Sequence, residues 1–395
     1  RQIEKTKFDK ILSKPNDSLI EIIGDELDKA FIDASLKLGL LETNLRSNFK
    51  IVFTSLHGTS ITAVPQVLKN AGYNNVNIVA AQAKPDGNFP TVKSPNPEDP
   101  EALKLAIEEA EKLNADIVIG TDPDSDRLGV AVRDLDNKFY LLNGNQTMAV
   151  MTYYLLENWK KKNNLNGNQF IASTIVSSPM IKKIALSYGV KYMETLTGFK
   201  WIGKLIKDNP SLNFIGGGEE SFGYLVGSEI RDKDAVTSTL LACEIGAHSK
   251  QIGKSFYNIL ETCYRKFGAY KERLISFTQT GKEGAKKINE MMNSFRYNSP
   301  KKLGSKKIIQ IDDYLISKRF KPLPNHKVNI DLPKSNVIIY KLEDNSRIAI
   351  RPSGTEPKIK FYFSVNSKMG ENESWKEVEQ KLDTKINKLI ETLNL

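Results

Sequence analysis

Up to residue 268, the chain alternates between short apolar runs and stretches in which apolar residues recur with helical spacing. Apolar runs rich in β-branched residues predict strands at 50–56, 76–81, 115–120, 128–133, 138–142, 169–176, 190–195 and 212–216. Apolar positions at helical spacing predict helices at 17–40, 60–71, 101–113, 143–162, 179–188, 199–208, 234–250 and 253–267. Strands that alternate with helices indicate mostly parallel sheets covered by helices.

The pattern changes after residue 270. Strands are predicted at 306–311, 336–343, 346–351 and 358–365, with a turn at Asp344-Asn345 and an amphipathic helix at 374–393. Such a succession without strict alternation indicates a separate α+β domain. The predicted fold class is therefore α/β, with two mixed-sheet α/β domains followed by a C-terminal α+β domain. We place a connector at 1–16 and the three domains at 17–145, 146–268 and 269–395.

The composition, with 40% hydrophobic and 26% charged residues, is typical of a globular protein. No apolar run reaches the roughly 18 residues that span a bilayer, so no membrane role is expected. The two cysteines, Cys243 and Cys263, fall in predicted helices and indicate reduced core thiols of a cytoplasmic protein. The net charge of +10 includes lysine clusters without interleaved aromatic residues. We therefore expect a solvated basic surface and cations for a small anionic ligand, and no nucleic-acid partner.

Acidic residues occupy every second position of the loop between two predicted strands, at Asp122, Asp124 and Asp126. In an extended loop this spacing would turn the three side chains to one side. Carboxylates about 5 Å apart repel by about 3 kcal/mol per pair at an effective dielectric near 20, so a buried trio needs a cation. Oxygen ligands favour Mg²⁺, with Ca²⁺ or Mn²⁺ as substitutes. A solvated acidic turn is the alternative interpretation.

Two glycine-containing stretches follow other predicted strands. Thr197-Gly198-Phe199-Lys200 enters a helix, although Thr197 could act only as the helix cap. The run Gly216-Gly217-Gly218 permits close backbone approach, and it is followed by Glu219-Glu220-Ser221. Glu219 and Ser221 offer an acceptor and a hydroxyl, as a hydroxyl-rich ligand such as a sugar needs. A plain glycine-rich turn would explain the glycines but not the acidic residues after them.

Two charged stretches complete the candidate site. Arg231-Asp232-Lys233-Asp234 reads by itself as a solvated charged face. In Arg351-Pro352-Ser353-Gly354-Thr355, an arginine, two hydroxyls and the backbone of a glycine turn form a nest suited to phosphate. Neither a Walker A motif nor a dinucleotide glycine pattern occurs, so a nucleotide is not the expected ligand. His57, just after a strand, is expected to be structural rather than catalytic.

Taken together and in this order, these stretches resemble the α-D-phosphohexomutase superfamily, the phosphoglucomutases and phosphomannomutases. Residues 121–127 resemble its metal loop, 218–221 its sugar-recognition loop and 351–355 its phosphate-binding loop. Residues 197–200 and 231–234 resemble further substrate-contacting segments. The Glu-Glu-Ser form of the sugar loop is similar to the phosphoglucomutase and phosphopentomutase branch.

The resemblance implies a phosphoserine enzyme that interconverts hexose 1-phosphate and hexose 6-phosphate through a bound bisphosphate. Mg²⁺ on the three aspartates and glucose 1,6-bisphosphate as primer are implied as cofactors. Arg127 and Lys233 are implied as catalytic residues, with Lys200 as an alternative to Lys233. The family's catalytic serine lies in a Ser-His-Asn-Pro loop of a first domain, and Ser94-Pro95-Asn96-Pro97 lacks its histidine. We therefore expect a missing N-terminal domain and no turnover without it.

Other functions stay open from the residues alone. The same loops would serve a phosphopentomutase or a non-catalytic sugar-phosphate-binding protein. A phosphatase with an aspartate nucleophile is a further alternative, in which Asp122 would carry the phosphoryl group. Neither the preferred sugar nor the oligomeric state can be deduced from the sequence.

Overall fold

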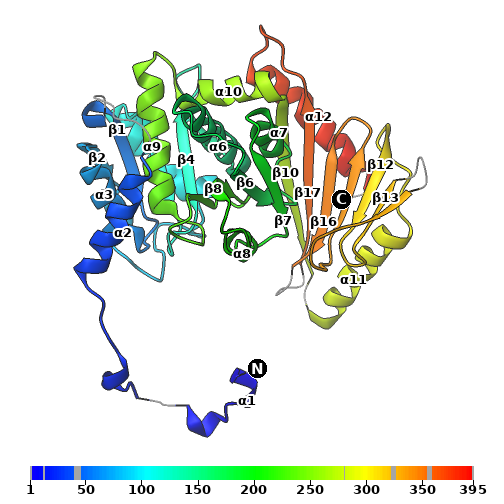
Figure 1. Ribbon diagram of the computed structural model, residues 1–395, viewed down its shortest axis with the longest axis horizontal. Coiled ribbons are helices and arrows are strands. Elements are labelled where there is room, and N and C mark those ends of the chain that lie inside the picture. The colour runs from blue at the N-terminus through cyan, green and yellow to red at the C-terminus, as the bar shows by residue number, and fades with distance from the viewer. Residues whose placement is uncertain are drawn as a thin grey trace.

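The computed structural model describes residues 2–11, 14–39, 46–279, 281–321, 326–353 and 358–393. Figure 1 shows three sheets that follow one another along the chain, each with helices packed against it. The first two sheets mix parallel and antiparallel pairs, and the third is antiparallel throughout. The predicted fold class is thereby confirmed.

The first sheet has the strand order β2-β1-β3-β4-β5. Its strands are β1 (Lys50–Thr54), β2 (Asn75–Ile78), β3 (Ile117–Thr121), β4 (Leu128–Arg133) and β5 (Phe139–Leu142). Its helices and turns are α2 (Asp25–Lys37), η3 (Arg46–Asn48), α3 (Ser60–Asn70), α4 (Ala80–Ala83), η4 (Pro100–Leu103) and α5 (Lys104–Leu113). Strand residues alternate between two cores: Phe53 and Ile119 join the core shared with α3, whereas Val52 and Val118 pack with Ala106 of α5.

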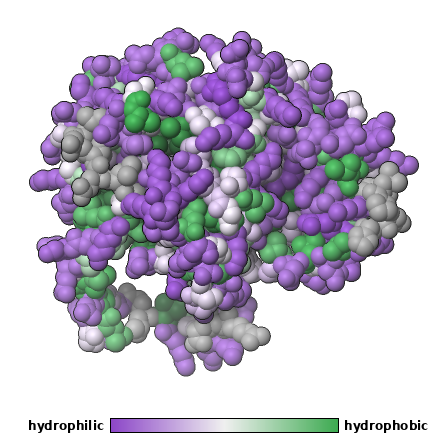
Figure 2. Space-filling view, turned by 45° about the horizontal axis from the view of Figure 1, so that its top comes forward, coloured by the Kyte–Doolittle hydropathy of each residue, from purple (hydrophilic) through white to green (hydrophobic). Residues whose placement is uncertain are grey.

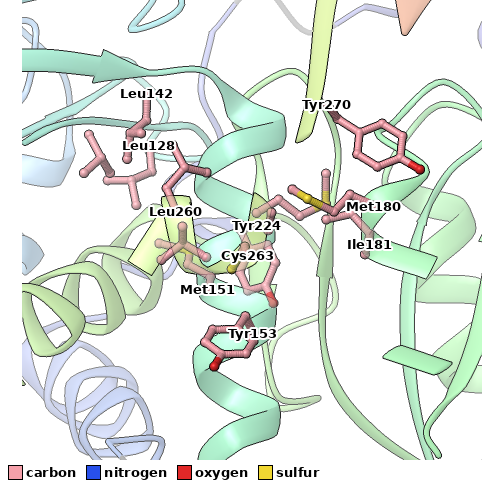
Figure 3. Packing of buried hydrophobic residues seen from close by; sticks show 14 of the residues in the cluster. Leu128, Leu142, Met151, Tyr153, Met180, Ile181, Tyr224, Leu260, Cys263 and Tyr270 are labelled. Atoms are coloured by element: carbon pink, nitrogen blue, oxygen red, sulfur yellow. The ribbon is translucent and has the colours of Figure 1, made fainter. Parts of the chain in front are cut away.

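The second sheet has the order β7-β6-β8-β9. Its strands are β6 (Gln169–Thr174), β7 (Lys191–Thr195), β8 (Asn213–Gly218) and β9 (Tyr224–Val226). Its helices are α6 (Gly144–Lys161), α7 (Met180–Ser187), α8 (Lys200–Asp208), α9 (Ala235–Gln251) and α10 (Phe256–Phe267). Helices α6 and α9 contact strands of both sheets and are buried along most of their length. Figure 3 shows the resulting shared core, in which Leu128 of β4, Met151 of α6 and Leu260 of α10 lie close together.

The third sheet has the order β10-β17-β16-β15-β12-β13-β14, with β11 paired to β12. Its strands are β10 (Ala269–Thr278), β11 (Lys302–Leu303), β12 (Lys306–Asp313), β13 (Lys318–Lys321), β14 (His326–Asn329), β15 (Ile338–Leu342), β16 (Arg347–Pro352) and β17 (Lys358–Ser367). Helices α11 (Gly281–Tyr297) and α12 (Trp375–Thr392) pack on one face. On the other face, Ile339, Ala349 and Tyr362 pack with Val176 and Leu196, which follow β6 and β7. Each sheet together with its helices is called a unit below, so this contact joins the third unit to the second. The predicted turn at Asp344-Asn345 joins β15 to β16, and Asn345 has a φ of 64°.

The prediction of one helix over 17–40 is wrong at its start. Among its described residues, the segment before α2 contains α1 (Gln2–Lys5), η1 (Phe8–Lys10) and η2 (Asp17–Leu19), and Figure 1 shows it extending away from the sheets. Ile22 and Ile23 are 90% and 68% exposed, so their apolar spacing does not reflect a packed helical face. Residue 40 lies outside the described residues.

Several elements between 224 and 330 are missing from the sequence prediction. Strand β10 is defined by its pairing with β17 along all ten of its residues, a long-range contact that local pattern does not reveal. Helix α11 did carry a local signal, because Ile288, Met292 and Phe295 recur with helical spacing and pack into the core.

Among the described residues, no helix is both long and apolar enough to cross a bilayer. Figure 2 shows mainly hydrophilic residues on the face that it draws, with apolar residues in small scattered groups. Cys243 and Cys263 are both buried and unpaired with each other, as expected of core thiols.

We expect Trp375→Ala to lower the free energy of unfolding by about 3–5 kcal/mol, the usual cost of deleting a large buried aromatic side chain. Trp375 of α12 is 1% exposed, its ring centroid lies 4.3 Å from that of Tyr264 on α10, and its Nε1 donates to the Tyr140 hydroxyl of β5 at 3.4 Å. Urea unfolding followed by circular dichroism measures the effect. The control Leu186→Ala, at a side chain 55% exposed, should change stability by less than about 0.5 kcal/mol. Equal losses of stability in both variants would contradict the view that Trp375 anchors α12 against α10 and β5.

Candidate functional site

The acidic trio lies at the turn of the β3–β4 hairpin. One carboxylate oxygen from each of Asp122, Asp124 and Asp126 lies within 4.8 Å of the others. The loop joins two strands as predicted, but its backbone turns instead of being extended: the Ser125 N–H donates to the Asp122 carbonyl at 3.1 Å, and Ser125 has a φ of 62°. The side chains therefore converge because the backbone reverses, not because they alternate along an extended strand.

Backbone contacts fix this turn from both sides. The Asp122 carboxylate accepts hydrogen bonds from the N–H groups of Asp126 and Arg127 at 3.0 and 2.9 Å. Pro123 presses against Gly58, where a Cβ atom would lie 2.3 Å from the Pro123 Cα. The Thr59 N–H donates to the Pro123 carbonyl at 2.8 Å. The start of α3 thus holds the acidic turn in place and requires glycine at position 58.

The trio is partly balanced by two basic side chains. Lys233 Nζ lies 2.9 Å from Asp126 Oδ2, and Arg127 Nε lies 3.5 Å from Asp122 Oδ2. Burial, together with the neighbouring Asp126 and Asp124 carboxylates, raises the pKa of Asp122 to about 7, although the hydrogen bond from the Arg127 N–H opposes the rise. Burial alone would favour a neutral Lys233, but its hydrogen bond to Asp126 raises the pKa of the amine overall. Lys233 is therefore a cation near neutral pH.

These residues fit a divalent cation. Three carboxylates supply the hard oxygen donors that Mg²⁺ prefers. Asp126 Oδ1 is buried and has no hydrogen-bond partner among the described residues, as expected of an oxygen reserved for an ion. Asp122, Asp124 and Asp126 would hold the ion, which would add positive charge at the turn.

A cleft of about 400 Å³ opens beside the turn, a size typical of small-molecule sites. All three units contribute to its walls. The lining residues are Asn96, Glu98, Arg127, Asn143, Asn145, Val176, Glu219, Glu220, Ser221, Phe222, Glu272, Arg273, Leu274, Arg351, Lys360, Tyr362 and Phe363. Arg127 lines this cleft and also contacts the acidic trio, so it links the two.

The glycine-rich stretch ends β8 and delivers Glu219, Glu220 and Ser221 to the cleft. Its glycines permit close approach: a Cβ atom at Gly217 would lie 2.2 Å from the Ala172 carbonyl, and one at Gly223 would lie 2.1 Å from Lys233 Cδ. Beyond the turn, the Phe222 carbonyl accepts a hydrogen bond from the Leu128 N–H at 2.9 Å. The sugar-loop candidate and the acidic hairpin are thus joined directly.

The two glutamates of this loop are desolvated. Burial raises the pKa of Glu219, while the Gly198 N–H, Lys233, Arg351 and Arg127 oppose the rise. Burial and the Glu219 charge raise the pKa of Glu220 to about 6. Glu220 accepts hydrogen bonds from the hydroxyls of Thr174 and Ser177 at 3.1 and 3.3 Å and is therefore tied into the second sheet.

The residues of the Thr197–Lys200 stretch differ in how they relate to the cleft. Gly198 has a φ of 104°, and its N–H donates to Glu219 Oε1 at 2.7 Å, so it orients that carboxylate. Lys200 is exposed and its Nζ lies 5.6 Å from the Trp201 ring centroid. In the described part of the chain, Thr197 and Lys200 are not among the residues that line the cleft.

The charged stretch at 231–234 is more than a solvated face. Arg231 and Asp232 are exposed, but Lys233 reaches the acidic turn. Asp234 is buried and caps α9, where it accepts hydrogen bonds from the Val236 and Thr237 N–H groups at 2.9 and 3.2 Å. The cap places Lys233 at the start of α9, beside the metal-site candidate.

The phosphate-site candidate is only partly described. Arg351 of β16 lines the cleft and donates to the Tyr362 hydroxyl at 3.4 Å. Ser353 follows β16, where its N–H donates to the Lys358 carbonyl at 2.9 Å, and it is not among the lining residues. Gly354 and Thr355 lie outside the described residues.

Sequence reasoning missed several cleft residues. Asn96 and Glu98 come from the proline-rich loop before η4, which gave only a turn signal. Lys360 stands opposite Arg351 in the β16–β17 register, so pairing the two predicted strands could have found it. Glu272 belongs to the unpredicted β10, and burial raises its pKa to about 7.

The contacts of His57 are those expected of a structural residue. The side chain is buried, its Nδ1 lies 3.2 Å from the Lys84 carbonyl, and its Nε2 lies 2.8 Å from the Thr91 hydroxyl. Both ring nitrogens are therefore occupied in holding the loop that carries Asn96 and Glu98.

We expect the affinity of the chain for Mg²⁺ to fall about tenfold per pH unit below pH 7, because a proton on Asp122 competes with the ion. Calorimetric titration at pH 6 and pH 8 measures this, and equal affinities would contradict it.

Without metal, the raised pKa of Asp122 contributes stability that is present at acidic pH and lost as the pH rises through 7. The melting temperature of the metal-free chain should therefore fall between pH 5 and pH 8, and less so in Asp122→Asn.

Comparison with known proteins is consistent with this geometry. Models of phosphoglucomutase/phosphomannomutase α/β/α domain II and domain III match residues 29–136 and 143–267. Phosphoglucomutases of Staphylococcus aureus strains MRSA252 and MSSA476 are 42% and 40% identical over 321 and 342 residues, or 81% and 86% of this chain. The chain spans 57% and 60% of the length of these curated relatives.

Solved structures share the fold at low sequence identity. The open form of parafusin, a phosphoglucomutase from Paramecium, has a TM-score of 0.62 and 21% identity over 93% of this chain and 61% of its own. N-acetylphosphoglucosamine mutase of Aspergillus fumigatus, in complex with GlcNAc-6P and magnesium, has a TM-score of 0.53 and 11% identity over 94% of this chain and 66% of its own. With two domains of one family matched in order, the chain belongs to the phosphoglucomutase/phosphomannomutase family of the α-D-phosphohexomutase superfamily.

Proposed function

We propose that this chain forms the metal-binding and sugar-phosphate-binding part of a phosphosugar mutase that interconverts hexose 1-phosphate and hexose 6-phosphate. One observation carries the proposal: Arg127, which contacts the acidic trio, lines one cleft together with the Glu219–Ser221 loop and Arg351. The Leu128–Phe222 hydrogen bond joins the first two, and the charges of Arg127 and Arg351 both act on Glu219. The relatives named phosphoglucomutase support the same reaction class.

The charges in the cleft suit a ligand with a phosphate at each end. Arg127 lies beside the acidic turn, whereas Arg351 and Lys360 come from neighbouring strands of the third sheet. Glu219, Glu220 and Ser221 of the second unit also line the cleft and offer partners for hydroxyl groups. A hexose bisphosphate such as glucose 1,6-bisphosphate matches this arrangement, and it could bind in either orientation.

Phosphoryl transfer requires positioning and charge neutralisation more than covalent chemistry from the protein. Arg351 and Lys360 would hold the non-reacting phosphate, and Arg127 would neutralise the phosphoryl group in transfer. Lys233, kept protonated by Asp126, would donate a proton or a hydrogen bond at the reacting oxygen. Bound Mg²⁺ would supply further positive charge at the reacting phosphate.

The Ser-His-Asn-Pro loop that carries the family's nucleophile does not occur in this sequence. By family resemblance, a phosphoserine donates its phosphoryl group to the sugar phosphate and recovers it from the reoriented bisphosphate. We propose that this serine lies in a domain outside the present sequence, in keeping with the share of the relatives that the chain spans. Glucose, mannose and pentose phosphates are all candidate substrates, since Glu219 and Ser221 would contact hydroxyls common to several sugars.

We expect Arg351→Gln to weaken binding of glucose 1,6-bisphosphate to the chain by about 10- to 100-fold, because a charge-assisted phosphate contact contributes about 1.5–3 kcal/mol. Isothermal titration calorimetry in Mg²⁺ measures the loss. The control Arg319→Gln removes an arginine of the same sheet that pairs with Asp312 and does not line the cleft. It should bind as the wild-type chain does, and equal losses in both variants would contradict the assigned phosphate site.

The purified chain should not convert glucose 1-phosphate to glucose 6-phosphate, even with Mg²⁺ and glucose 1,6-bisphosphate present, because the phosphorylated serine is lacking. A coupled dehydrogenase assay for glucose 6-phosphate measures this. A Ser-His-Asn-Pro loop in the reading frame upstream of Arg1 would support the mutase over a non-catalytic binder. Turnover by the chain alone, or an aspartyl-phosphate trapped on Asp122, would overturn the mechanism.

A further inference from the structure

The guanidinium of Arg127 lies between two groups of carboxylates. Its Nη1 is 2.6 Å from Glu98 Oε1. Its Nε is 3.5 Å from Asp122 Oδ2 and 3.7 Å from Asp126 Oδ1, both of which belong to the acidic trio. The shortest contact is therefore made with Glu98, a carboxylate that is not part of the trio.

Glu98 is held in a built position rather than on a loose surface loop. The preceding residue, Pro97, packs on β4 at Gly129, where a Cβ atom would lie 2.8 Å from the Pro97 Cβ. The Asn96 side chain accepts a hydrogen bond from the Glu98 N–H at 3.0 Å, and the Asp99 side chain caps η4 directly after it. The backbone on both sides of Glu98 is thereby fixed, so its carboxylate has a defined place at the cleft wall.

Removal of the Glu98 charge would change where Arg127 is attracted. Among the described residues, the other carboxylates within 4 Å of its guanidinium are those of Asp122 and Asp126. Asp126 is already paired with Lys233, and its Oδ1 is the buried oxygen without a hydrogen bond. A second cation drawn onto these oxygens would compete with a metal ion for them, since both are attracted to the same charges.

We propose that Glu98 is a positioning residue, which keeps the guanidinium of Arg127 from moving closer to the acidic trio. The trio then keeps its oxygens for a divalent cation, and Arg127 keeps its charge directed into the cleft. The inference rests on the cation site of the proposed function, and it concerns a side chain that the family resemblance did not assign.

A double-mutant cycle tests this on the purified chain, with Mg²⁺ affinity measured by isothermal titration calorimetry at pH 8. We expect Glu98→Gln to weaken Mg²⁺ binding about tenfold, as loss of a charge-mediated contact does. Arg127→Met should bind Mg²⁺ at least as tightly as the wild-type chain. In the Glu98→Gln/Arg127→Met double variant the affinity should equal that of Arg127→Met, because the glutamate acts through the arginine.

The matched control is Glu101→Gln, which removes a carboxylate of the same segment that is 80% exposed and 3.9 Å from Lys104. It should leave Mg²⁺ affinity unchanged, and melting curves in chelator should show that every variant folds. Glu98→Asp, which keeps the charge, should recover part of the lost affinity.

The possible outcomes distinguish a failure of the Glu98 role from a failure of the cation site. An unchanged affinity in Glu98→Gln overturns the positioning role while the cation site stands. An equal tenfold loss in the Arg127→Met background also overturns it, because Glu98 would then act on the ion as a distant charge. Absence of Mg²⁺ binding to the wild-type chain overturns the cation site and, with it, both the proposed function and this inference.

Discussion

The site depends on mutual repulsion between carboxylates at one turn. Asp122, Asp124 and Asp126 converge within 4.8 Å, and at about 5 Å such a pair repels by about 3 kcal/mol at an effective dielectric near 20. Burial is the largest cause of the raised pKa of Asp122, and the repulsion from Asp126 and Asp124 adds to it. Arg127 and Lys233 offset this charge only in part, and a divalent cation is the natural completion. The neighbouring loops therefore surround a turn whose negative charge is only partly neutralised.

The repelling side chains stay together because backbone contacts leave the turn no room to open. Gly58 lets α3 press on Pro123, Gly144 lets α6 approach the Glu220 carbonyl, and Gly223 leaves room for the stem of Lys233. A β-carbon at any of these positions would lie between 2.1 and 2.3 Å from its neighbour, closer than packed atoms allow. Packing of α6 and α9 between the first two sheets thus supplies the stability that the charged turn lacks.

Electrostatics also explains why the cleft has walls from three units. Basic groups confined to a single unit would leave one side of an anionic ligand without a positive partner. Here Arg127 comes from the first unit, whereas Arg351 and Lys360 come from the third, and the carboxylates of Glu219 and Glu220 lie on the second. A ligand with two anionic ends and hydroxyls between them would satisfy all of these groups at once. The third unit is joined to the second at Gly268, directly after α10.

The sequence by itself determined most local elements and many of the candidate site residues, because strand and helix periods and clustered polar residues are local properties. The acidic trio, Glu219 with Ser221, and Arg351 were all found in this way. Tertiary structure alone decided that Glu98 and Lys360 belong to the cleft, that Lys200 is exposed and that Ile22 and Ile23 stay largely exposed. Strand β10 likewise exists through its pairing with β17, far away in the chain. Each of these depends on which distant segment lies opposite a residue, and a local pattern of polar and apolar positions carries no record of that.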